Sequence, residues 1–499
     1  MQTVADILTY AARRTPDHKA LFLGGQSVTY EQLLLQASII GTGLQAKGIR
    51  RGDCILTMLQ NHWGAVVLHW AAQLYGVVIC PVNWRTTASE LAFFAKDCSA
   101  KAIFYDEHSE AAAKAFDAAP GVIVAEAPQD GWHNSDDTWP NLLQRRPDPL
   151  PEIGEDDISV ILYTSGTTGL GKGVPRSHRA ERAASIAHIA QNGLFSGDIS
   201  LGVMPFYHTM GVRILLSSAL LSGSLICQPR FEPNETLDLI ARHKISSLYL
   251  VPTLYHDLLM VLDKHPRALP SIDRLGFAGA SMSDGLLQKL TRQFPGVKII
   301  NHYGSSEIYT YTVTQKAASK PGSAGRAGLN ATIAIIPLGS DDITERERQG
   351  IQGQVIASAD SAEAFAGYLN RPDADAAAFR SGWYLTGDVG YLDTDGELFL
   401  TGRVDDMIIT GGENVMPVEI ESVLSLHPDV SEAVIIGRPD ERLGQKITAC
   451  IVAKRDVSAS QLDKHCRQSG LPGYRCPKDY EFLQEIPKSP VGKILRRLI

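Results

Sequence analysis

The residues best suited to chemistry form one short run, Tyr163 to Gly173, with the sequence Tyr-Thr-Ser-Gly-Thr-Thr-Gly-Leu-Gly-Lys-Gly. Its serine, threonine and glycine residues offer hydroxyl and backbone N–H groups without side-chain bulk, and Lys172 adds a positive charge. We therefore predict that this loop holds the phosphates of ATP. A plain surface loop is the alternative that the run alone leaves open.

The same run comes close to the P-loop pattern but departs from it after the lysine. Gly173 stands where a P-loop has the Ser or Thr that ligates Mg²⁺. Pro175 follows almost at once, which is awkward for a helix that would begin at Lys172. The loop is thus predicted to bind phosphate in a different way.

Two clusters further along the chain carry residue types that suit a nucleotide. In Asn301 to Glu307, a tyrosine can stack on a purine and a glutamate can hold Mg²⁺ against phosphate oxygens. In Trp383 to Asp388, a carboxylate behind a predicted tight glycine turn suits hydrogen bonds to ribose hydroxyls. A turn-capping aspartate is the plain alternative for the second cluster.

Two more clusters lie near the C-terminus. In Gly402 to Asn414, Arg403 can meet ribose or phosphate, and the adjacent Asp405 and Asp406 are typical of a solvated hinge. The last cluster, Lys488 to Arg497, is basic, and basic residues at a chain end are usually just solvated. Each cluster is a weak signal alone, so the prediction depends on their combination.

The elements that would position these residues follow from hydrophobic patterning. Short apolar runs alternate with helix-length segments, which predicts crossover units and mostly parallel sheets. From about residue 384 the pattern changes to a hairpin, with Asp395-Gly396 as its turn, and then to a small α+β unit. Residues 126–157 are rich in Pro, Asp and Gln, and we expect an exposed connector there.

Composition limits the class of protein. A chain of 499 residues suggests about two to four domains. A net charge of −8 argues against a general nucleic-acid or membrane-surface binder. The seven cysteines contain no C-x-x-C pair, which is typical of reduced thiols, and the N-terminus shows no signal peptide, so we expect a cytoplasmic protein.

Taken together and in this order, the clusters resemble the adenylate-forming superfamily of acyl- and aryl-CoA synthetases, luciferases and peptide-synthetase adenylation domains. The resemblance runs nearly end to end. It is closest to the 4-chlorobenzoate and benzoate type of CoA ligase, through four segments: residues 1–4, 358–361, 402–414 and 495–497.

The resemblance implies a fold and a two-step reaction. The fold is α/β, with a large multi-layer N-terminal domain of mostly parallel sheets (residues 1–404) and a small mobile α+β C-terminal domain (residues 405–499) hinged at Asp405. A carboxylate first attacks the α-phosphate of ATP, which gives an acyl-adenylate and pyrophosphate. The small domain then rotates, and the thiol of coenzyme A displaces AMP. The expected ligands are ATP, Mg²⁺, coenzyme A and a small carboxylic acid, without nucleic acid or membrane, in a monomer or homodimer.

The resemblance also implies residue roles. Lys493, His208 and Glu307 would be catalytic, and Glu307 with Thr164 would bind the metal. ATP and AMP would be held by Thr164, Ser165, Gly166, Thr167, Thr168, Gly169, Lys172, Gly279, Ala280, Ser281, His302, Tyr303, Gly304, Ser305, Asp388, Arg403 and Lys493. The acyl pocket would consist of Ala187, His208, Thr209, Tyr249, Ala280, His302, Gly304, Tyr309 and Thr310. Coenzyme A would be bound by Arg85, Gly411, Gly412, Glu413, Arg475 and Lys478.

The chain departs from the family pattern at two places. Gly171 replaces the proline that usually precedes the loop lysine, and Ala187 stands where the halobenzoate ligase has a phenylalanine. Polar residues at the other pocket positions make a chlorinated ring an unlikely first choice. We expect a small aromatic, heteroaromatic (a furoate, for instance) or alicyclic acid.

Three other functions are alternatives to a CoA ligase. A stand-alone adenylation enzyme that loads a carrier protein usually has an aspartate after the Pro-Phe-Tyr-His block, whereas Met210, Gly211 and Val212 follow it here. An inactive nucleotide-binding regulator would not need the full set of site residues. A hydrolase is disfavoured because neither G-x-S-x-G nor H-E-x-x-H is present.

Overall fold

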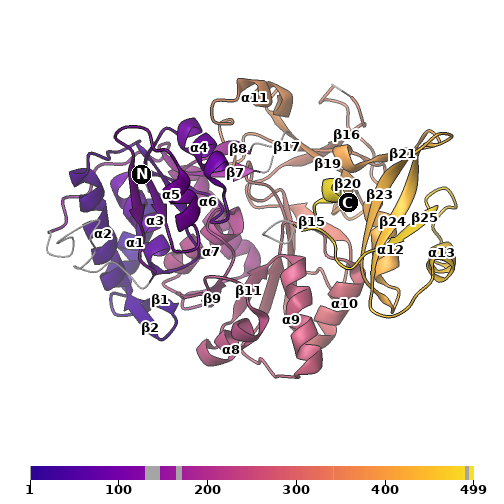
Figure 1. Ribbon diagram of the computed structural model, residues 1–499, viewed down its shortest axis with the longest axis horizontal. Coiled ribbons are helices and arrows are strands. Elements are labelled where there is room, and N and C mark those ends of the chain that lie inside the picture. The colour runs from indigo at the N-terminus through magenta and orange to yellow at the C-terminus, as the bar shows by residue number, and fades with distance from the viewer. Residues whose placement is uncertain (1, 130–145, 165–170, 341, 489–493) are drawn as a thin grey trace.

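The computed structural model describes residues 2–129, 146–164, 171–340, 342–488 and 494–499. Lys493 and the loop residues 165–170 lie outside the described residues. Figure 1 shows the first half of the chain gathered at one end of the molecule and the last strands at the other.

The first sheet comes from the N-terminal part of the chain. Its strand order is β6-β5-β3-β4-β7-β8, parallel except for the last pair. The strands are β3 (Cys54–Met58), β4 (Val78–Pro81), β5 (Ala100–Tyr105), β6 (Ile123–Glu126), β7 (Ile158–Thr164) and β8 (Lys172–Ser177). The first five helices are α1 (Val4–Arg14), α2 (Tyr30–Ala46), α3 (Trp63–Tyr75), α4 (Ala88–Asp97) and α5 (Glu110–Ala115).

Local sequence signals account for several of these helix ends. Thr29 Oγ1 accepts a hydrogen bond from the Gln32 N–H, and Gln32 Oε1 accepts one from the Thr29 N–H, so the two residues form a capping box at the start of α2. All residues of α3 are buried, as expected for an apolar segment that is a core helix. Within the described residues, no helix is both long and apolar enough to cross a membrane.

The second sheet is larger and mixed. Its order is β16-β17-β19-β20-β15-β14-β13-β12-β11-β9-β10-β1-β2, with β18 paired to β19. The strands are β1 (Lys19–Leu23), β2 (Gln26–Thr29), β9 (Ile199–Gly202), β10 (Ser224–Cys227), β11 (Ser247–Leu250), β12 (Arg274–Phe277), β13 (Lys298–Tyr303), β14 (Thr312–Thr314), β15 (Ser323–Ala327), β16 (Ile333–Ile336), β17 (Gly353–Ser358), β18 (Phe379–Arg380), β19 (Trp383–Leu392) and β20 (Leu398–Arg403). The part from β1 to β13 is parallel, whereas the part after β13 is antiparallel.

Crossover helices connect the parallel strands. They are α7 (Thr209–Leu220), α8 (Pro233–His243), α9 (Pro252–Lys264) and α10 (Asp284–Gln293). The helix α6 (His178–Asn192) leads from β8 of the first sheet to β9 of the second, and α11 (Pro372–Ala378) follows later. Because neighbouring parallel strands end at the same edge, the loops after β12 and β13 lie side by side. These loops contain Gly279 to Ser281 and Gly304 to Glu307.

The C-terminal part forms a separate small sheet, at the right of Figure 1. It contains β21 (Ile408–Thr410), β22 (Glu413–Val415), β23 (Val430–Asp440), β24 (Gly444–Ala453) and β25 (Asp479–Phe482), with α12 (Pro417–Ser425) and α13 (Ala459–Gln468). A short 3₁₀ helix, Val404–Asp406, joins it to β20. The expected α/β fold with a small α+β C-terminal unit is confirmed. The boundary at 404/405 stays a prediction.

One local prediction was wrong. Asp388 does not follow a tight turn, because it lies within the long strand β19. Pairing with β20 extends the backbone there, where the local sequence predicted a turn. The strand before Glu307, β13, continues through Tyr303 in the same way, where it pairs with β14.

Candidate active site

A first cluster joins the ends of β13 and β20 to the middle of β19 in the large sheet. The hydroxyl of Tyr303, at the end of β13, donates to Asp388 Oδ2 over 2.6 Å. Arg403 lies opposite Asp388 in the register of β19 and β20, and its Nη1 is 3.2 Å from Asp388 Oδ1. Burial, with a smaller contribution from the Asp388 charge, raises the pKa of Tyr303. An aromatic face beside a held carboxylate and a cation suits a purine nucleoside.

Gly387 explains how Arg403 reaches this carboxylate. Its φ is +75°, a conformation that favours glycine, and a Cβ there would lie 2.9 Å from Arg403 Nη2. The glycine therefore leaves room for Arg403 beside Asp388 from a position inside a strand, whereas a role of Asp388 toward ribose stays a prediction.

A second cluster gathers around Tyr368, which the sequence analysis missed. Its hydroxyl donates to Glu307 Oε1 over 2.8 Å and lies 3.1 Å from the hydroxyl of Tyr384. The Nζ of Lys172 lies 4.3 Å from the centre of the Tyr368 ring. Tyr368 thus contacts both the buried carboxylate of Glu307 and Lys172, which come from segments far apart in the sequence. The only local signals were the turn residues Gly367 and Pro372.

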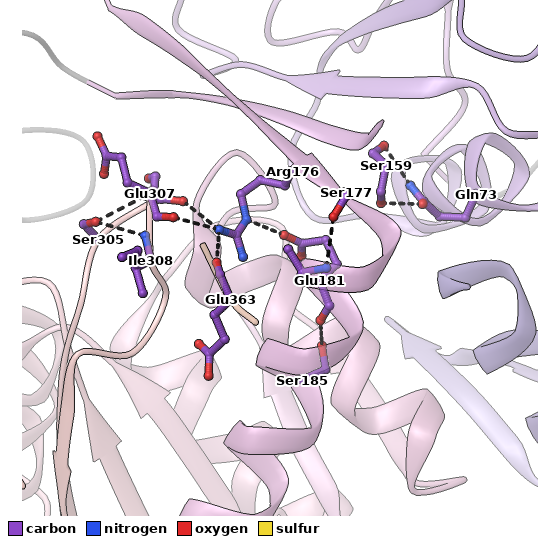
Figure 2. A network of polar contacts seen from close by, with 12 residues as sticks. Gln73, Ser159, Arg176, Ser177, Glu181, Ser185, Ser305, Glu307, Ile308 and Glu363 are labelled. Carbon is purple, nitrogen blue, oxygen red and sulfur yellow. Dashed lines mark hydrogen bonds and ion pairs between the residues drawn. The ribbon is translucent and has the colours of Figure 1, made fainter. Parts of the chain in front are cut away.

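Arg176, also missed, holds the backbone of the glutamate loop (Figure 2). From β8 its Nε donates to Glu181 Oε1 over 2.8 Å, and its Nη1 donates to the carbonyls of Glu307 and Glu363. Figure 2 shows the Glu307 carboxylate pointing away from this guanidinium. Arg176 therefore positions the loop and leaves the carboxylate for another cation.

The loop predicted to hold phosphate follows β7 in the sequence and precedes β8, which pairs with β7 in the antiparallel direction. Thr164 pairs with Lys172 in this register, and the Thr164 hydroxyl lies 3.4 Å from the Lys172 carbonyl oxygen. Lys172 begins a strand and not a helix, which confirms that the loop is not a P-loop. The predicted ligands Ser165, Gly166, Thr167, Thr168 and Gly169 lie outside the described residues.

The predicted acyl-pocket residues come from α6, α7 and the strands that end beside them. The rings of Tyr249 and His302 are 5.2 Å apart, and His188 lies 4.8 Å from Tyr249 and 5.4 Å from His302. His208 and Thr209 stand at the start of α7, where the His208 ring is 4.8 Å from Tyr207. These rings form a compact wall with little room beyond it. The cavity behind, lined by Asn192, Tyr249 and Gly276 among others, is about 20 Å³.

The remaining predicted pocket positions adjoin this wall. Ala187 is buried on α6, and Gly304 runs so close to Tyr309 that a Cβ would lie 2.0 Å from the Tyr309 carbonyl oxygen. Tyr309 and Thr310 are also buried, whereas Ala280, in the loop after β12, is exposed. Burial lowers the pKa of His302 to about 3 and that of His188 well below its ordinary value, with Arg213 adding to both effects. The pocket histidines are therefore neutral.

The residues predicted to bind coenzyme A lie on separate elements. Arg85 is exposed in the loop after β4, with its Cζ 3.8 Å from the centre of the Trp84 ring. Gly411 and Gly412 form the β21–β22 turn, where both have positive φ as a two-residue hairpin turn requires, and Glu413 follows. Arg475 pairs with Glu419, and Lys478 donates to the Gly473 carbonyl. Asp405, the expected hinge, is exposed in the 3₁₀ helix.

A larger cavity than the one behind the rings lies elsewhere. A space of about 650 Å³ between the β1–β2 turn and α8 is lined by residues such as Trp63, Glu235 and Arg242 and by none of the predicted site residues. We therefore place the candidate active site at the two clusters and the ring-walled pocket.

Comparisons with known proteins show the family of the chain. The pattern of the family described as "AMP-binding enzyme" matches residues 8–369, and that described as "AMP-binding enzyme C-terminal domain" matches residues 419–493. A 4-chlorobenzoate–CoA ligase of an Arthrobacter species is 30% identical over 511 residues, covering 100% of this chain and 95% of that protein. The long-chain-fatty-acid–CoA ligase FadD13 of Mycobacterium tuberculosis is 31% identical over 480 residues, covering 95% and 92%.

A solved structure extends the likeness to three dimensions. The o-succinylbenzoate coenzyme A synthetase of Bacillus subtilis, in complex with ATP and magnesium ion, matches with a TM-score of 0.83 at 27% identity, covering 98% of both chains.

Proposed function

Because this chain belongs to the AMP-binding enzyme family, as an AMP-forming acid–thiol ligase, we propose that its substrate is a small aromatic, heteroaromatic or alicyclic carboxylic acid. The acid would be activated as an acyl-adenylate and then transferred to coenzyme A. The observation that carries this proposal is the compact pocket of buried rings, Tyr249, His302 and His188, beside the Tyr303 and Tyr368 clusters.

In the first step, a carboxylate oxygen bonds to the α-phosphorus of ATP while the bond from that phosphorus to the bridging oxygen breaks. Tyr303 would face the adenine, and Asp388 with Arg403 would hold the ribose. Lys172 and the loop before it would restrain the leaving pyrophosphate. Lys493 would approach the carboxylate and the α-phosphate, where a cation offsets the charge of two anions brought together.

The residues present fit the predicted magnesium ion. Glu307 offers a carboxylate whose second oxygen is not used by Tyr368, and Thr164 offers a hydroxyl, and Mg²⁺ prefers such oxygen ligands. When bound, the ion would offset the negative charge of the phosphates. Tyr368 and Arg176 would orient Glu307 from its side chain and its backbone.

In the second step, the thiolate of coenzyme A bonds to the acyl carbon and AMP leaves. Rotation about Asp405 would bring Gly411, Gly412 and Glu413 to the site, where glycines permit close approach of a narrow thiol arm. His208 would stand between the acyl pocket and the thiol path. The basic residues Arg85, Arg475 and Lys478 would meet the phosphates of coenzyme A.

The pocket wall favours a small acid over a long chain. The rings of His188, Tyr249 and His302 lie 4.8–5.4 Å apart, and the space behind them, about 20 Å³, has room for about one water molecule. A long alkyl chain would need a tunnel through this wall. A carrier-protein thiol in place of coenzyme A remains the alternative acceptor.

A panel of small carboxylic acids with ATP and coenzyme A tests the proposal, with AMP and the thioester followed together. We expect equimolar AMP and thioester with at least one ring acid and none with a long-chain acid. Pyrophosphate release without thioester across the panel, or a preference for long chains, would overturn it. The same panel with a phosphopantetheinylated carrier protein in place of coenzyme A separates the two acceptors.

A further inference from the structure

Arg213 is a buried cation beside the predicted acyl-pocket residues Tyr309 and Thr310, and the reaction described above does not use it. It lies one helical turn after Thr209 on α7 and is 2% exposed. Its Nη1 donates to Thr310 Oγ1 over 3.3 Å, and its Cζ lies 4.7 Å from the centre of the Tyr309 ring. Its Nε and Nη2 atoms are buried without a hydrogen-bond partner among the described residues.

The other buried arginines of the large domain are paired with acids. Arg176 bonds to Glu181 over 2.8 Å, and Arg274 bonds to Asp198 over 3.0 Å. No ion pair joins Arg213 to an acid in the part of the chain that the structure describes. An unpaired buried charge is costly, so such a group in a pocket indicates a ligand that supplies the missing acceptor.

His302 supplies a complementary atom in the same pocket. The amide nitrogen of Asn192 donates to the His188 carbonyl oxygen over 2.7 Å, and this bond fixes the orientation of the amide. The amide oxygen of Asn192 therefore faces His302 Nε2 at 3.0 Å, so Nε2 must carry the hydrogen. The lone pair is then on His302 Nδ1, which is buried without a hydrogen-bond partner among the described residues.

The two groups share one environment. Arg213 contacts Thr310 and the Tyr309 ring, and its side chain also interacts with Tyr249, whose ring lies 5.2 Å from that of His302. The charge of Arg213 accordingly adds to the lowering that burial causes in the pKa of His302. Arg213 and His302 thus present donors and an acceptor to the same ring-walled pocket. The neighbouring Thr310, which Arg213 contacts directly, is one of the predicted pocket residues.

We propose that Arg213, with His302, forms a subsite for a second oxygen on the acid, at the end remote from the carboxylate that is activated. The substrate class is a small ring acid with a hydrogen-bond-accepting oxygen, carried as a second carboxylate, a hydroxyl or a ring oxygen. A carboxylate accepts two N–H bonds from one guanidinium, and a hydroxyl accepts from Arg213 while donating to His302 Nδ1. This inference rests on the proposed function, because it places the acid in the same pocket.

The test compares pairs of acids that share a ring and differ in the second oxygen. Hydroxybenzoates and benzene dicarboxylates are compared with benzoate, and furoate with cyclopentane carboxylate, by the kcat/KM of thioester formation. We expect at least one oxygen-bearing acid to exceed its partner by ~10-fold or more, because a site built to hydrogen-bond a substrate rejects the analogue that lacks the group. The pair of acids that shows this ratio tells whether the second oxygen belongs to a hydroxyl, a carboxylate or the ring.

Variants at position 213 test whether Arg213 causes this ratio of kcat/KM values. In Arg213→Met the ratio should fall toward one, and in Arg213→Lys it should persist only for a dicarboxylate, because lysine keeps the charge without the fork of donors. Arg438→Met is the control, since it removes an arginine that is paired with Glu481 and lies on β23 of the C-terminal sheet, away from the pocket. It should lower the melting temperature and leave the ratio unchanged.

Wild-type ratios below ~2-fold for every pair, with thioester still formed, would overturn the subsite and leave the proposed function standing. A ratio that survives in Arg213→Met would also overturn it. If that variant does not fold, the wild-type ratios decide alone. Absence of thioester with every acid would instead defeat the proposed function.

Discussion

At the scale of single residues, the hydroxyl of Tyr368 joins the glutamate and lysine segments of the site. It donates to Glu307 Oε1 over 2.8 Å, and its ring lies under Lys172. Tyr368→Phe keeps the ring and removes the hydroxyl. We expect the KM for Mg·ATP to rise by about 10-fold, because groups that orient metal ligands are worth about that much in metal affinity.

Steady-state titration of ATP and Mg²⁺ measures this effect. Tyr10→Phe, at an exposed position on α1, is the control. An unchanged KM in Tyr368→Phe would mean that Glu307 keeps its orientation through its backbone contacts alone.

Lys493 allows the two half-reactions to be separated. Lys493→Ala removes the cation proposed to meet the carboxylate and the α-phosphate, so adenylation should slow by ~100-fold or more. Thioester formation from supplied acyl-adenylate should keep its rate, because the lysine would have left the site by then. Pyrophosphate exchange and single-turnover thioester assays measure the two steps, and equal losses in both would contradict the two-conformation assignment.

The lowered pKa values of buried histidines allow a prediction of how the folding stability depends on pH. Burial lowers the pKa of His69 and His302 to about 3 and that of His178 to about 4. These groups stay neutral in the folded protein, whereas in the unfolded chain they take up protons below about pH 6.5. The stability that depends on these neutral histidines is therefore fully present above about pH 6.5, and it is lost as the pH falls toward their pKa values in the folded protein.

Urea unfolding at several pH values tests this dependence. Each such histidine should remove about 1.4 kcal/mol of unfolding free energy per pH unit below about pH 6. His69→Gln should reduce the slope by one proton, and His108→Gln, at a partly exposed position, controls for the substitution itself. A slope that His69→Gln leaves unchanged would show that this ring is protonated in the folded state.

At the scale of elements, patterning predicted what is encoded locally and missed what depends on pairing between distant segments. The apolar runs at β7, β10 and β11 and the capping box of α2 are local, and they form the expected strands and helix. The extension of β13 through Tyr303 comes from pairing with β14, which no local pattern shows.

In the candidate site too, residues within recognisable motifs were predicted, whereas residues that depend on distant partners were not. Tyr303, Asp388 and Arg403 were identified from motif resemblance, and they do meet in space. Tyr368 and Arg213 were missed because each stands alone in its segment and acquires its role only from partners far away in the sequence.

Gly387 within β19 gives a prediction at this scale. Gly387→Ala places a Cβ at a φ of +75°, and 2.9 Å from Arg403 Nη2, so it should cost about 1–2 kcal/mol and also push Arg403 away from Asp388. Gly396→Ala is a matched control, because its φ is +76° and a Cβ there meets nothing within 4 Å. Both variants should unfold at lower urea concentration, and only Gly387→Ala should raise the KM for ATP. Equal ATP kinetics in the two variants would rule out the contact with Arg403.

At the scale of the whole molecule, the site lies where separately folded parts meet. β7 and β8 belong to one sheet, and β13, β19 and β20 to the other. The C-terminal sheet is joined to β20 by only the short 3₁₀ helix at Val404–Asp406. Near the end of the chain, Arg496 hydrogen-bonds Glu421 on α12, and Figure 1 shows β21, next to the Gly411 turn, toward the outside of the molecule.

The contact between α10 and α12 makes the proposed rotation testable. A Cβ at Gly285 on α10 would lie 2.7 Å from the carbonyl oxygen of Ser425 on α12, and the neighbouring Asp284 interacts with Ser422. This contact must break if the small domain rotates about Asp405. Asp284→Cys with Ser422→Cys, joined by a short thiol cross-linker, should keep pyrophosphate exchange and lose thioester formation by ~100-fold or more.

The native cysteines are all buried, so the reagent should select the introduced pair. Each single-cysteine variant, treated in the same way, is the control for modification without a link. A cleavable linker should restore thioester formation once it is cut, because the chemistry of both steps is intact and only the rotation is blocked. Full thioester activity in the cross-linked enzyme would show that the α10–α12 contact does not have to open, and it would remove the rotation about Asp405 from the mechanism.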